Sequence, residues 1–364
     1  TPATAGEVFC IENAAGQQPQ LWQLAEPGQP AFAIKGESVT SDGKNIFRAT
    51  VVGDGSEHRY VAFDANILNA LPTVTNAGTV ANQDLHATEP QDMVIITPAS
   101  GIFDSEAERL AEAHRQAEGL RVKVVRADQV YNEFSSGTPD ATAYRRFMKM
   151  LYDRAADTPA DQPRYLLLFG DAAWDNRMIT NAWVNQRPEN FLLCYESINS
   201  WHDVNSYVME DYFGLLDDGE GTNLTNEKVD LGIGRFPVRT KSEAKILVDK
   251  SIDYIQAVHA GAWKNTVMFL GDDGDNNQHL WMADSVANKT SRAYPELEVR
   301  KLMWDAYQRQ TSSTGNSYPE VKQVIDRQME EGALLMNYVG HAATYCLSHE
   351  QTLRLEDFAA YASP

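Results

Sequence analysis

Hydrophobic and polar positions alternate in two different ways along the 364 residues of the chain. Before about residue 88, the apolar runs are short, rich in β-prone residues and separated by Gly, Pro, Asn and Asp, which predicts strands joined by turns. The predicted strands are Glu7–Glu12, Gln20–Leu24, Ala31–Glu37, Asn45–Val52 and His58–Phe63. These are too few to close a convincing sandwich, so residues 1–88 are expected to form a partial β-rich domain that ends in a polar linker, Thr75–Asp92.

From Met93 onward, apolar runs alternate with longer segments of helical composition, which predicts a mostly parallel sheet with helices on both faces. Asp104 is a candidate N-cap for the first helix. We assign residues 89–260 to a first α/β subdomain. Its predicted strands are Met93–Thr97, Leu120–Val125, Tyr165–Phe169 and Val229–Ile233, and its predicted helices are Ser105–Glu118, Thr138–Ala155 and Ser242–Val258.

A second α/β subdomain with the same rhythm is predicted over residues 261–364. Its expected elements are strand Thr266–Leu270, helix His279–Ser291, strand Glu298–Met303, helix Pro319–Glu331 and strand Ala333–Tyr338. Only a short helix is expected after the last of these strands, so the sheet is expected to be unfinished.

Chemically active side chains follow two strands of this second subdomain. The strand Ala333–Tyr338 leads into Gly340 and His341, and the strand Thr266–Leu270 leads into the acidic loop Gly271–Asn277. In open α/β sheets, active sites collect at the carboxyl ends of the strands. A histidine beside a carboxylate there predicts a general base with its orienting acid. The alternatives are a structural histidine, a solvated turn, or a calcium-binding loop whose spacing departs from that of an EF-hand.

Charge and composition exclude several classes of function. The net charge of −20 argues against nucleic-acid binding, which needs clustered Lys and Arg. No strand leads into a GxGxxG or Walker-type loop, so a dinucleotide or nucleotide site has no support. The chain has no apolar run long enough to cross a membrane. It starts at Thr1 without Met or a leader segment, so we expect that a leader was removed or that the chain was cut from a longer precursor.

The three cysteines, Cys10, Cys194 and Cys346, are far apart and provide neither a CxxC motif nor a disulfide framework. We expect Cys10 and Cys194 to be buried, inert thiols. Cys346 lies only five residues after His341, so the chain would have to fold back sharply for its thiolate to face the imidazole. We therefore disfavour it as a nucleophile.

Several segments in order carry a resemblance to the gingipain family of cysteine peptidases, and most closely to its members that act as sortases of the type IX secretion system in Bacteroidota. The segments span most of the chain from Met93 to its end, and Trp22–Pro27 is similar to part of the preceding β-rich region. They are Val130–Asp140, Leu166–Asp171, Trp174–Arg177, Asp211–Gly214, Asp230–Pro237, Gly271–Asn277 and Asn337–His341.

The resemblance implies an α/β fold: a caspase-like peptidase domain of two α/β subdomains behind the partial β-rich domain. It maps the catalytic histidine to His341, within Tyr-x-Gly-His, and the acid that orients it to Asp272, with Asp273 as the neighbouring candidate. The nucleophilic cysteine is expected beyond Pro364, so the chain alone is expected to be inactive.

Two positions depart from the family pattern. The family has Gly after the histidine, with its backbone N–H in the oxyanion hole, and here that residue is Ala342. If it needed a positive φ, alanine would distort the hole. The substrate-binding acid of gingipains aligns with Asn276, so a strict preference for Arg or Lys is not expected. No metal ligand or required cofactor is implied, and calcium enters only as a candidate structural ion.

The function implied by the resemblance is cleavage of the C-terminal sorting domains of secreted proteins through a cysteine thioester. The acyl group would pass to water or to an anchoring lipopolysaccharide. Expected partners are those secreted proteins and outer-membrane secretion components, with no nucleic acid, at the cell surface in association with the outer membrane. Two alternatives are a non-catalytic, peptidase-like scaffold that binds secretion signals and a secreted peptidase without a sortase role.

Overall fold

The computed structural model describes residues 7–14, 17–25, 30–51, 58–66, 76, 78–197, 207–222, 224, 226–313 and 315–361. The chain forms two compact units, Thr1–Asn82 and Gln83–Pro364. The second unit starts six residues before the expected boundary at 88/89, because the Glu133 carboxylate accepts the backbone N–H of Leu85 at 2.7 Å and the side-chain amide of Gln83 at 2.7 Å. Val52 of a predicted strand, Thr75 and Ala77 of the predicted linker, and Glu26 and Pro27 of the segment that carries the resemblance lie outside the described residues.

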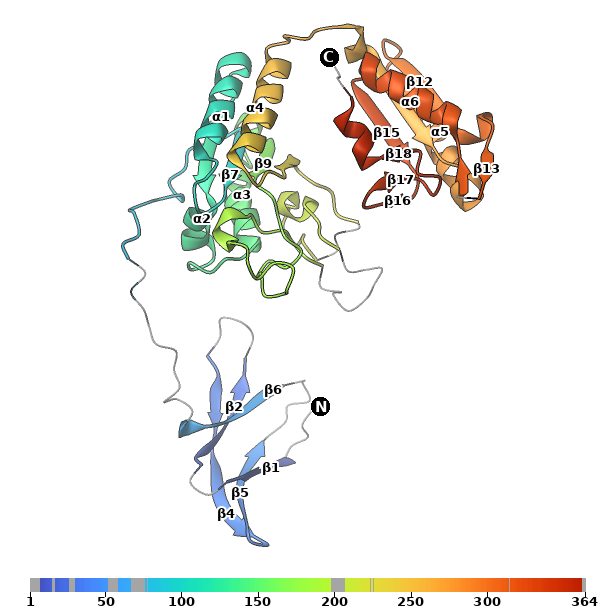
Figure 1. Cartoon of the computed structure of the whole chain (residues 1–364). Helices are drawn as coiled ribbons and strands as arrows, with labels where there is room; N and C mark the ends of the chain where they lie inside the picture. Colours follow the sequence, from blue (N-terminus) through green and yellow to red (C-terminus); the bar gives the residue numbers. More distant parts are fainter. Residues whose placement is uncertain are drawn as a thin grey trace. The chain divides into compact units, whose positions relative to one another are not determined.

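The N-terminal unit consists of two antiparallel three-stranded sheets, ordered β1-β5-β4 and β3-β2-β6 (Figure 1). Apolar side chains from both sheets, centred on Leu21 of one and Phe47 of the other, pack between them. This confirms the β character of the region. The strands are β1 (Glu7–Asn13), β2 (Pro19–Leu24), β3 (Phe32–Ile34), β4 (Gly36–Ser41), β5 (Lys44–Val51) and β6 (Arg59–Asp64).

The prediction of one strand over Ala31–Glu37 was wrong. The segment contains β3 and the start of β4, which belong to different sheets. Gly36 starts the second strand close to Phe47, and a Cβ on residue 36 would lie 2.4 Å from the tip of that ring. The chain therefore crosses between the sheets where only glycine fits, which an apolar pattern alone does not reveal.

The first α/β subdomain is built on a four-stranded parallel sheet ordered β10-β9-β7-β8. Its strands are β7 (Met93–Thr97), β8 (Val122–Arg126), β9 (Tyr165–Phe169) and β10 (Gly232–Phe236). Its α-helices are α1 (Asp104–Glu118), α2 (Ala127–Phe134), α3 (Thr142–Arg154) and α4 (Lys241–Ile255), with short 3-10 helices at Pro159–Asp161, Pro188–Asn190 and Asp211–Gly214. A further 3-10 helix, Ala262–Asn265, leads into the second subdomain.

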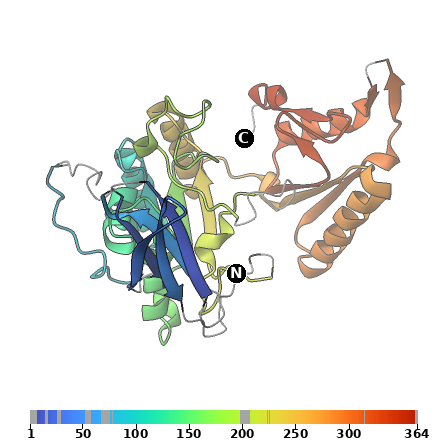
Figure 2. The ribbon, with the colours of Figure 1, turned by 90° about the horizontal axis from the view of Figure 1, so that it is seen from below.

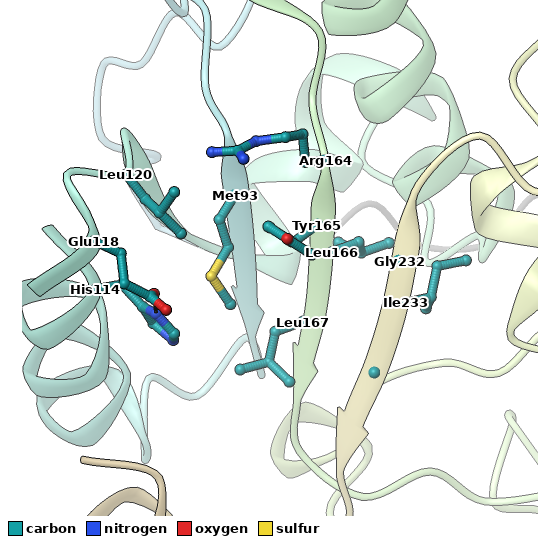
Figure 3. A pocket seen from close by; sticks show the side chains of 11 residues that line it. Met93, His114, Glu118, Leu120, Arg164, Tyr165, Leu166, Leu167, Gly232 and Ile233 are labelled. Atoms are coloured by element: carbon teal, nitrogen blue, oxygen red, sulfur yellow. Dashed lines mark hydrogen bonds and ion pairs between the residues drawn. The ribbon is translucent and has the colours of Figure 1, made fainter. Parts of the chain in front are cut away.

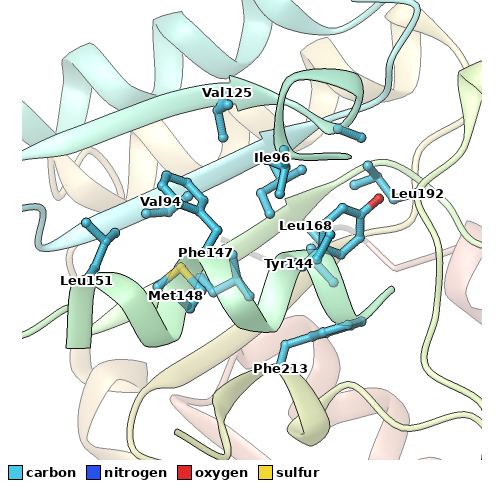
Figure 4. Close-up of a cluster of buried hydrophobic side chains, with 14 of the residues drawn as sticks. Val94, Ile96, Val125, Tyr144, Phe147, Met148, Leu151, Leu168, Leu192 and Phe213 are labelled. Atoms are coloured by element: carbon cyan, nitrogen blue, oxygen red, sulfur yellow. The ribbon is translucent and has the colours of Figure 1, made fainter. Parts of the chain in front are cut away.

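Alternate residues of the central strands face opposite helical layers. Val94 and Ile96 belong to the cluster that includes Phe147 of α3 and residues of α2 (Figure 4). Met93 and Ile95 pack instead with side chains of α1 and α4, the two helices that lie side by side in Figure 1. Because successive strand residues point to opposite faces, the sheet is buried on both sides, as predicted.

Three predictions in this subdomain need correction. Helix α2 was missed because it begins directly after β8, without a loop to mark the boundary. The side chain of Gln129 caps its start by accepting the N–H of Arg126 at 3.0 Å. The next helix starts at Thr142 rather than near Thr138, and its N–H donates to the Asp140 carboxylate at 2.8 Å. The strand expected at Val229–Ile233 starts later, at Gly232, and is β10. The partly exposed segment Gly232–Phe236 pairs with β9, whereas the apolar residues before it do not.

The second α/β subdomain has a parallel sheet ordered β12-β11-β15, with α5 over one face and α6 over the other (Figures 1 and 2). Strand Glu298–Met303 and helix Pro319–Glu331 match their predicted bounds. The main elements are β11 (Thr266–Gly271), α5 (Gly274–Ala293), β12 (Glu298–Met303), α6 (Pro319–Glu331) and β15 (Leu335–Val339). The smaller elements are β13 (Gln310–Ser312), β14 (Gly315–Ser317), β16 (Ala342–Ala343), β17 (Cys346–Leu347), β18 (Leu353–Arg354) and two 3-10 helices, Trp304–Ala306 and Leu355–Ala359.

Among the described residues, β11 is the one strand that pairs with β15, which therefore forms an edge of this sheet. After β15 the chain turns at Gly340 and His341 and continues into the small antiparallel sheet β16-β17-β18. None of the described helices has the length and apolar character needed to cross a membrane.

Candidate active site

The two segments that carry the predicted catalytic residues leave the second sheet at the same edge. Strands β11 and β15 are parallel neighbours in which Leu270 pairs with Tyr338 and Gly271 with Val339. The residues that follow each strand, Asp272 on one side and Gly340 on the other, therefore emerge together. This confirms the placement that the sequence predicts for the acidic loop and the histidine turn.

Asp272 is buried, with 3% of its surface exposed, and its carboxylate is fully engaged. Its Oδ1 lies 2.5 Å from Nδ1 of His279 and accepts the backbone N–H of Gly274 at 3.0 Å. Its Oδ2 accepts the hydroxyl of Tyr338 at 2.6 Å. Burial, reinforced by the nearby carboxylate, raises the pKa of Tyr338, so this hydroxyl stays a donor. Asp272 therefore anchors both β15 and the start of α5.

The glycine before His341 is required by this anchor. A Cβ on residue 340 would lie 2.2 Å from Oδ2 of Asp272 and 2.2 Å from the hydroxyl oxygen of Tyr338. No real Cβ contact is that short, so a larger residue would have to displace one of the two groups. Gly340 thus lets the turn pass directly over the hydrogen bond between Tyr338 and Asp272.

His341 extends from this turn towards solvent, with 72% of its side chain exposed. Its Nε2 lies 2.9 Å from Oδ2 of Asp275, and its ring packs edge-on against the ring of His279, with centroids 4.9 Å apart. The carboxylate in direct contact with His341 is thus that of Asp275. Of the two predicted orienting acids, Asp272 contacts His279, while Asp273 accepts the hydroxyl of Tyr318 at 2.6 Å. The catalytic roles of Asp272 and Asp273 stay predictions.

The acidic loop has an unusual backbone. Asp275, Asn276 and Asn277 have φ angles of 51°, 57° and 64°, so three successive residues adopt the left-handed conformation inside the segment that contains α5. Asp and Asn tolerate this region better than other non-glycine residues. The turn aims Asp275 at the two histidines. It leaves Asn276, the predicted substrate-binding residue, exposed beside them.

Ala342 adopts an extended conformation at the predicted oxyanion position. It belongs to β16, opposite Leu347 of β17, and its φ is not positive. The N–H of Ser348 donates to the carbonyl of His341 at 2.9 Å, which makes that pair a hydrogen-bonded one. In an antiparallel ladder the next pair does not exchange hydrogen bonds, so the N–H of Ala342 points away from β17. Alanine is therefore not strained here, and the oxyanion role of its N–H stays a prediction.

The cysteines differ from expectation in one case. Cys10 is exposed, so the prediction that it is buried was wrong: it lies on the outer face of β1, whose alternate residues pack inward. Cys194 is buried as predicted, and burial together with Glu196 raises the pKa of its thiol to about 11. Cys346 is also buried, in β17, with its sulfur 3.9 Å from the carbonyl oxygen of Ser348.

Polar residues that follow β9 form a structural network in the first subdomain. Asn176 donates to the carbonyl of Cys194 at 2.9 Å and accepts its N–H at 3.2 Å, and Asp171 pairs with Arg239. These contacts hold the long loop after β9 in place.

A hollow of about 530 Å³ lies between α1 and the amino ends of β7, β9 and β10, with Met93, His114 and Tyr165 on its walls (Figure 3). It contains none of the predicted site residues.

Two site residues were missed from the sequence, Asp275 and His279. Helical periodicity could not have paired them, because Asp275, four residues before His279, has a left-handed and not a helical backbone. With His341 they form one of two groups, among the described residues, whose ligand atoms could surround a metal ion. The other group is Asp84, His86 and Glu133.

Comparison with known proteins identifies the class. The model of peptidase family C25 matches residues 86–364. The chain therefore belongs to this family of cysteine peptidases, and its fold is the α/β fold of two subdomains that the sequence predicts. A search of curated proteins finds no match.

Among solved structures, the chain is similar to dimeric latent PorU from Porphyromonas gingivalis, with 34% identity and a TM-score of 0.55 over 79% of this chain. It is also similar to the Arg-specific cysteine proteinase gingipain R, with 16% identity and a TM-score of 0.43 over 74% of this chain. The chain spans 29% of the length of the PorU chain and 51% of that of gingipain R.

Proposed function

We propose that the chain carries the general base of a sortase-type cysteine peptidase. The observation that carries this proposal is the turn after β15 in a chain of family C25, where Gly340 passes over the hydrogen bond between Tyr338 and Asp272 and His341 lies beside Asp275. A histidine on a rigid turn at the carboxyl edge of a parallel sheet suits a base that has to meet a substrate at a fixed position.

In the proposed reaction, His341 accepts the proton of a cysteine thiol, and the thiolate attacks the carbonyl carbon of a peptide bond. The backbone N–H of Ala342 would help to stabilise the oxyanion. The C–N bond then breaks, the imidazolium of His341 gives its proton to the leaving amine, and the acyl group remains on sulfur as a thioester. Water or an amine then attacks this thioester and releases the thiolate, so one intermediate serves both hydrolysis and transpeptidation.

The nucleophile is proposed to lie outside these 364 residues. Cys194 is buried and has a pKa of about 11, so almost none of it is thiolate at neutral pH. Cys346 is buried within a hairpin, so neither of these two thiols is accessible as a thiolate. Cys10 is excluded from the proposal because it lies outside residues 86–364, which the family model matches.

The proposed substrates are secreted proteins that carry C-terminal sorting domains, and the proposed acceptors are water and an anchoring lipopolysaccharide. The similarity to PorU supports this choice within family C25. By the same reasoning, we propose a location at the cell surface and contact with outer-membrane secretion components. The neutral side chain of Asn276 is consistent with a sorting junction that does not require a basic residue.

The test is to label the protein at its natural length with a peptidyl acyloxymethyl ketone and to map the modified cysteine by mass spectrometry. The expected result is one labelled cysteine other than Cys10, Cys194 and Cys346, with labelling lost in His341→Gln. Labelling at Cys346 would overturn the assignment of the nucleophile, and no labelling would support a non-catalytic scaffold. Equal cleavage of generic and sorting-domain peptides would support a secreted peptidase without a sortase role.

A further inference from the structure

We propose that Asp275, His279 and His341 form a binding site for Zn²⁺. The metal binding follows from the arrangement of these side chains, whereas its consequence for catalysis rests on the proposed function of His341. When filled, the site would hold the enzyme in a reversible inactive state.

The distances between the ligand atoms suit one metal ion. Oδ2 of Asp275 lies 2.9 Å from Nε2 of His341 and 3.4 Å from Nε2 of His279, and the three ligand atoms all lie within 4.8 Å of one another. Tetrahedral zinc with bonds of about 2.0–2.2 Å separates its ligand atoms by roughly 3.3–3.5 Å. The group therefore needs only small side-chain shifts to close around an ion, with a fourth position left open to water.

The hydrogen-bond partner that would orient His279 towards a metal is already in place. Nδ1 of His279 lies 2.5 Å from the buried carboxylate of Asp272, which Tyr338 and the N–H of Gly274 hold from the other sides. A carboxylate in this position accepts the Nδ1 proton and leaves the Nε2 lone pair free for a metal, the arrangement that orients most metal-binding histidines. Here Nε2 of His279 faces Asp275, so the ring is preset towards the proposed ion.

The donor set selects zinc over the hard cations. Two imidazole nitrogens and one carboxylate oxygen match Zn²⁺, whereas Ca²⁺ and Mg²⁺ prefer oxygen ligands throughout. The remaining carboxylates of the loop do not add to an oxygen cage, because Asp272 is bound to His279 and Tyr338, and Asp273 to Tyr318.

The second group of candidate ligands is a useful contrast. Oε1 and Oε2 of Glu133 accept the N–H of Leu85, and Oε2 also lies 2.7 Å from Nδ1 of His86. A metal there would have to displace bonds that attach the start of the unit to α2. The group of Asp84, His86 and Glu133 therefore supplies a control rather than a second site.

Zinc at His341 would stop the proposed reaction in a simple way. The metal would occupy Nε2, the nitrogen that lies against Asp275, and its positive charge would make Nδ1 a weaker proton acceptor. The ring would also be fixed at Asp275. Removal of the metal by a chelator would restore the base without any change of fold.

The experiment measures Zn²⁺ binding directly on this chain, without a histidine tag, by competition with a chromogenic chelator. Co²⁺ absorption in the visible range reports the coordination geometry. We expect one equivalent of Zn²⁺, at least about tenfold weaker binding in His279→Gln, His341→Gln and Asp275→Asn, and a smaller loss in Tyr338→Phe. The controls His349→Gln, an exposed histidine after the same turn, and His86→Gln should bind as the unchanged chain does.

Unchanged binding in all three ligand variants, or its loss in His86→Gln, would overturn the site. The two proposals can fail separately. Probe labelling of the natural-length protein that is insensitive to Zn²⁺ would remove the inhibitory role and keep the peptidase. Stoichiometric Zn²⁺ binding with no labelling after chelation would keep the metal site and remove the peptidase.

Discussion

Nε2 of His341 lies 2.9 Å from Oδ2 of Asp275, whereas the buried carboxylate of Asp272 is bound to His279 and Tyr338. The acid that directly contacts the candidate base, Asp275, therefore comes from the left-handed turn. The acid at the end of β11, Asp272, contacts the neighbouring side chains instead. Because Asp272 and Asp275 have different contacts, substitutions can separate the effects of the two carboxylates.

Asp275→Asn in the natural-length protein is expected to slow labelling by the acyloxymethyl ketone by at least about tenfold, because the imidazole loses the charge that orients it. Asp284→Asn is the matched control, since Asp284 lies on α5 and contacts Lys301 and not His341. The rate of labelling against time gives the comparison. Equal rates in the Asp275→Asn variant and the unchanged protein would show that the contact has no catalytic role.

Gly340→Ala is expected to lower the free energy of unfolding of the second subdomain by about 1–3 kcal/mol, because its Cβ would overlap Asp272 and Tyr338. Urea unfolding followed by tryptophan fluorescence measures this, since Trp304 packs 5.3 Å from the ring of Tyr338. Gly234→Ala is the control: its Cβ would meet only Leu167, at 3.9 Å. A Gly340→Ala protein as stable as this control would show that a Cβ at residue 340 does not displace Asp272 or Tyr338.

Glu133 provides a pH-dependent contribution to stability. Burial alone would raise its pKa, but the N–H of Leu85, the amide of Gln83 and His86 together lower it from 4.5 to about 2. The folded state therefore favours the carboxylate, so the stabilisation is complete above pH 4.5 and is lost as the pH falls towards 2. Melting temperatures of Glu133→Gln and the unchanged chain should differ at pH 7 and converge near pH 2. A constant difference across this range would refute the assignment.

The cysteines should differ in reactivity towards iodoacetamide in the folded chain. Cys10 is exposed and is expected to be alkylated within minutes at pH 8, while Cys194, with its pKa of about 11, and the buried Cys346 should react only after denaturation. Mass spectrometry of peptides labelled before and after denaturation gives the three extents. Rapid native alkylation of Cys346 would place its thiol at the surface and reopen its candidacy as a nucleophile.

The sequence predicts the α/β layers well, because buried parallel strands such as Tyr165–Phe169 are continuous apolar runs between turn signals. It predicts β10 less well, since Gly232 and Gly234 give that strand a weak apolar pattern even though it pairs with β9 over its whole length. The register between β11 and β15 follows from the fold, so the meeting of Asp272 and Gly340 could be foreseen.

The contact of His341 with Asp275 could not be foreseen in the same way. It depends on three successive left-handed residues, and a run of Asp and Asn permits that conformation without requiring it. The role of His279 was hidden for the same reason: helical periodicity predicts a helix there but does not show that its first turn is aimed at the neighbouring strand. Local backbone geometry, and not the order of the strands, decides which acid reaches the histidine.

The left-handed turn also limits how this site can diversify. Asn276 has a φ of 57°, where Asn, Asp and Gly are tolerated and branched or bulky residues are strongly disfavoured. Evolution can therefore exchange an amide, a carboxylate or a bare backbone at this position at little energetic cost. An engineered lysine or isoleucine would have to rebuild the turn that aims Asp275. The chemistry offered at position 276 would thus change in a few discrete steps, chiefly by the gain or loss of one negative charge.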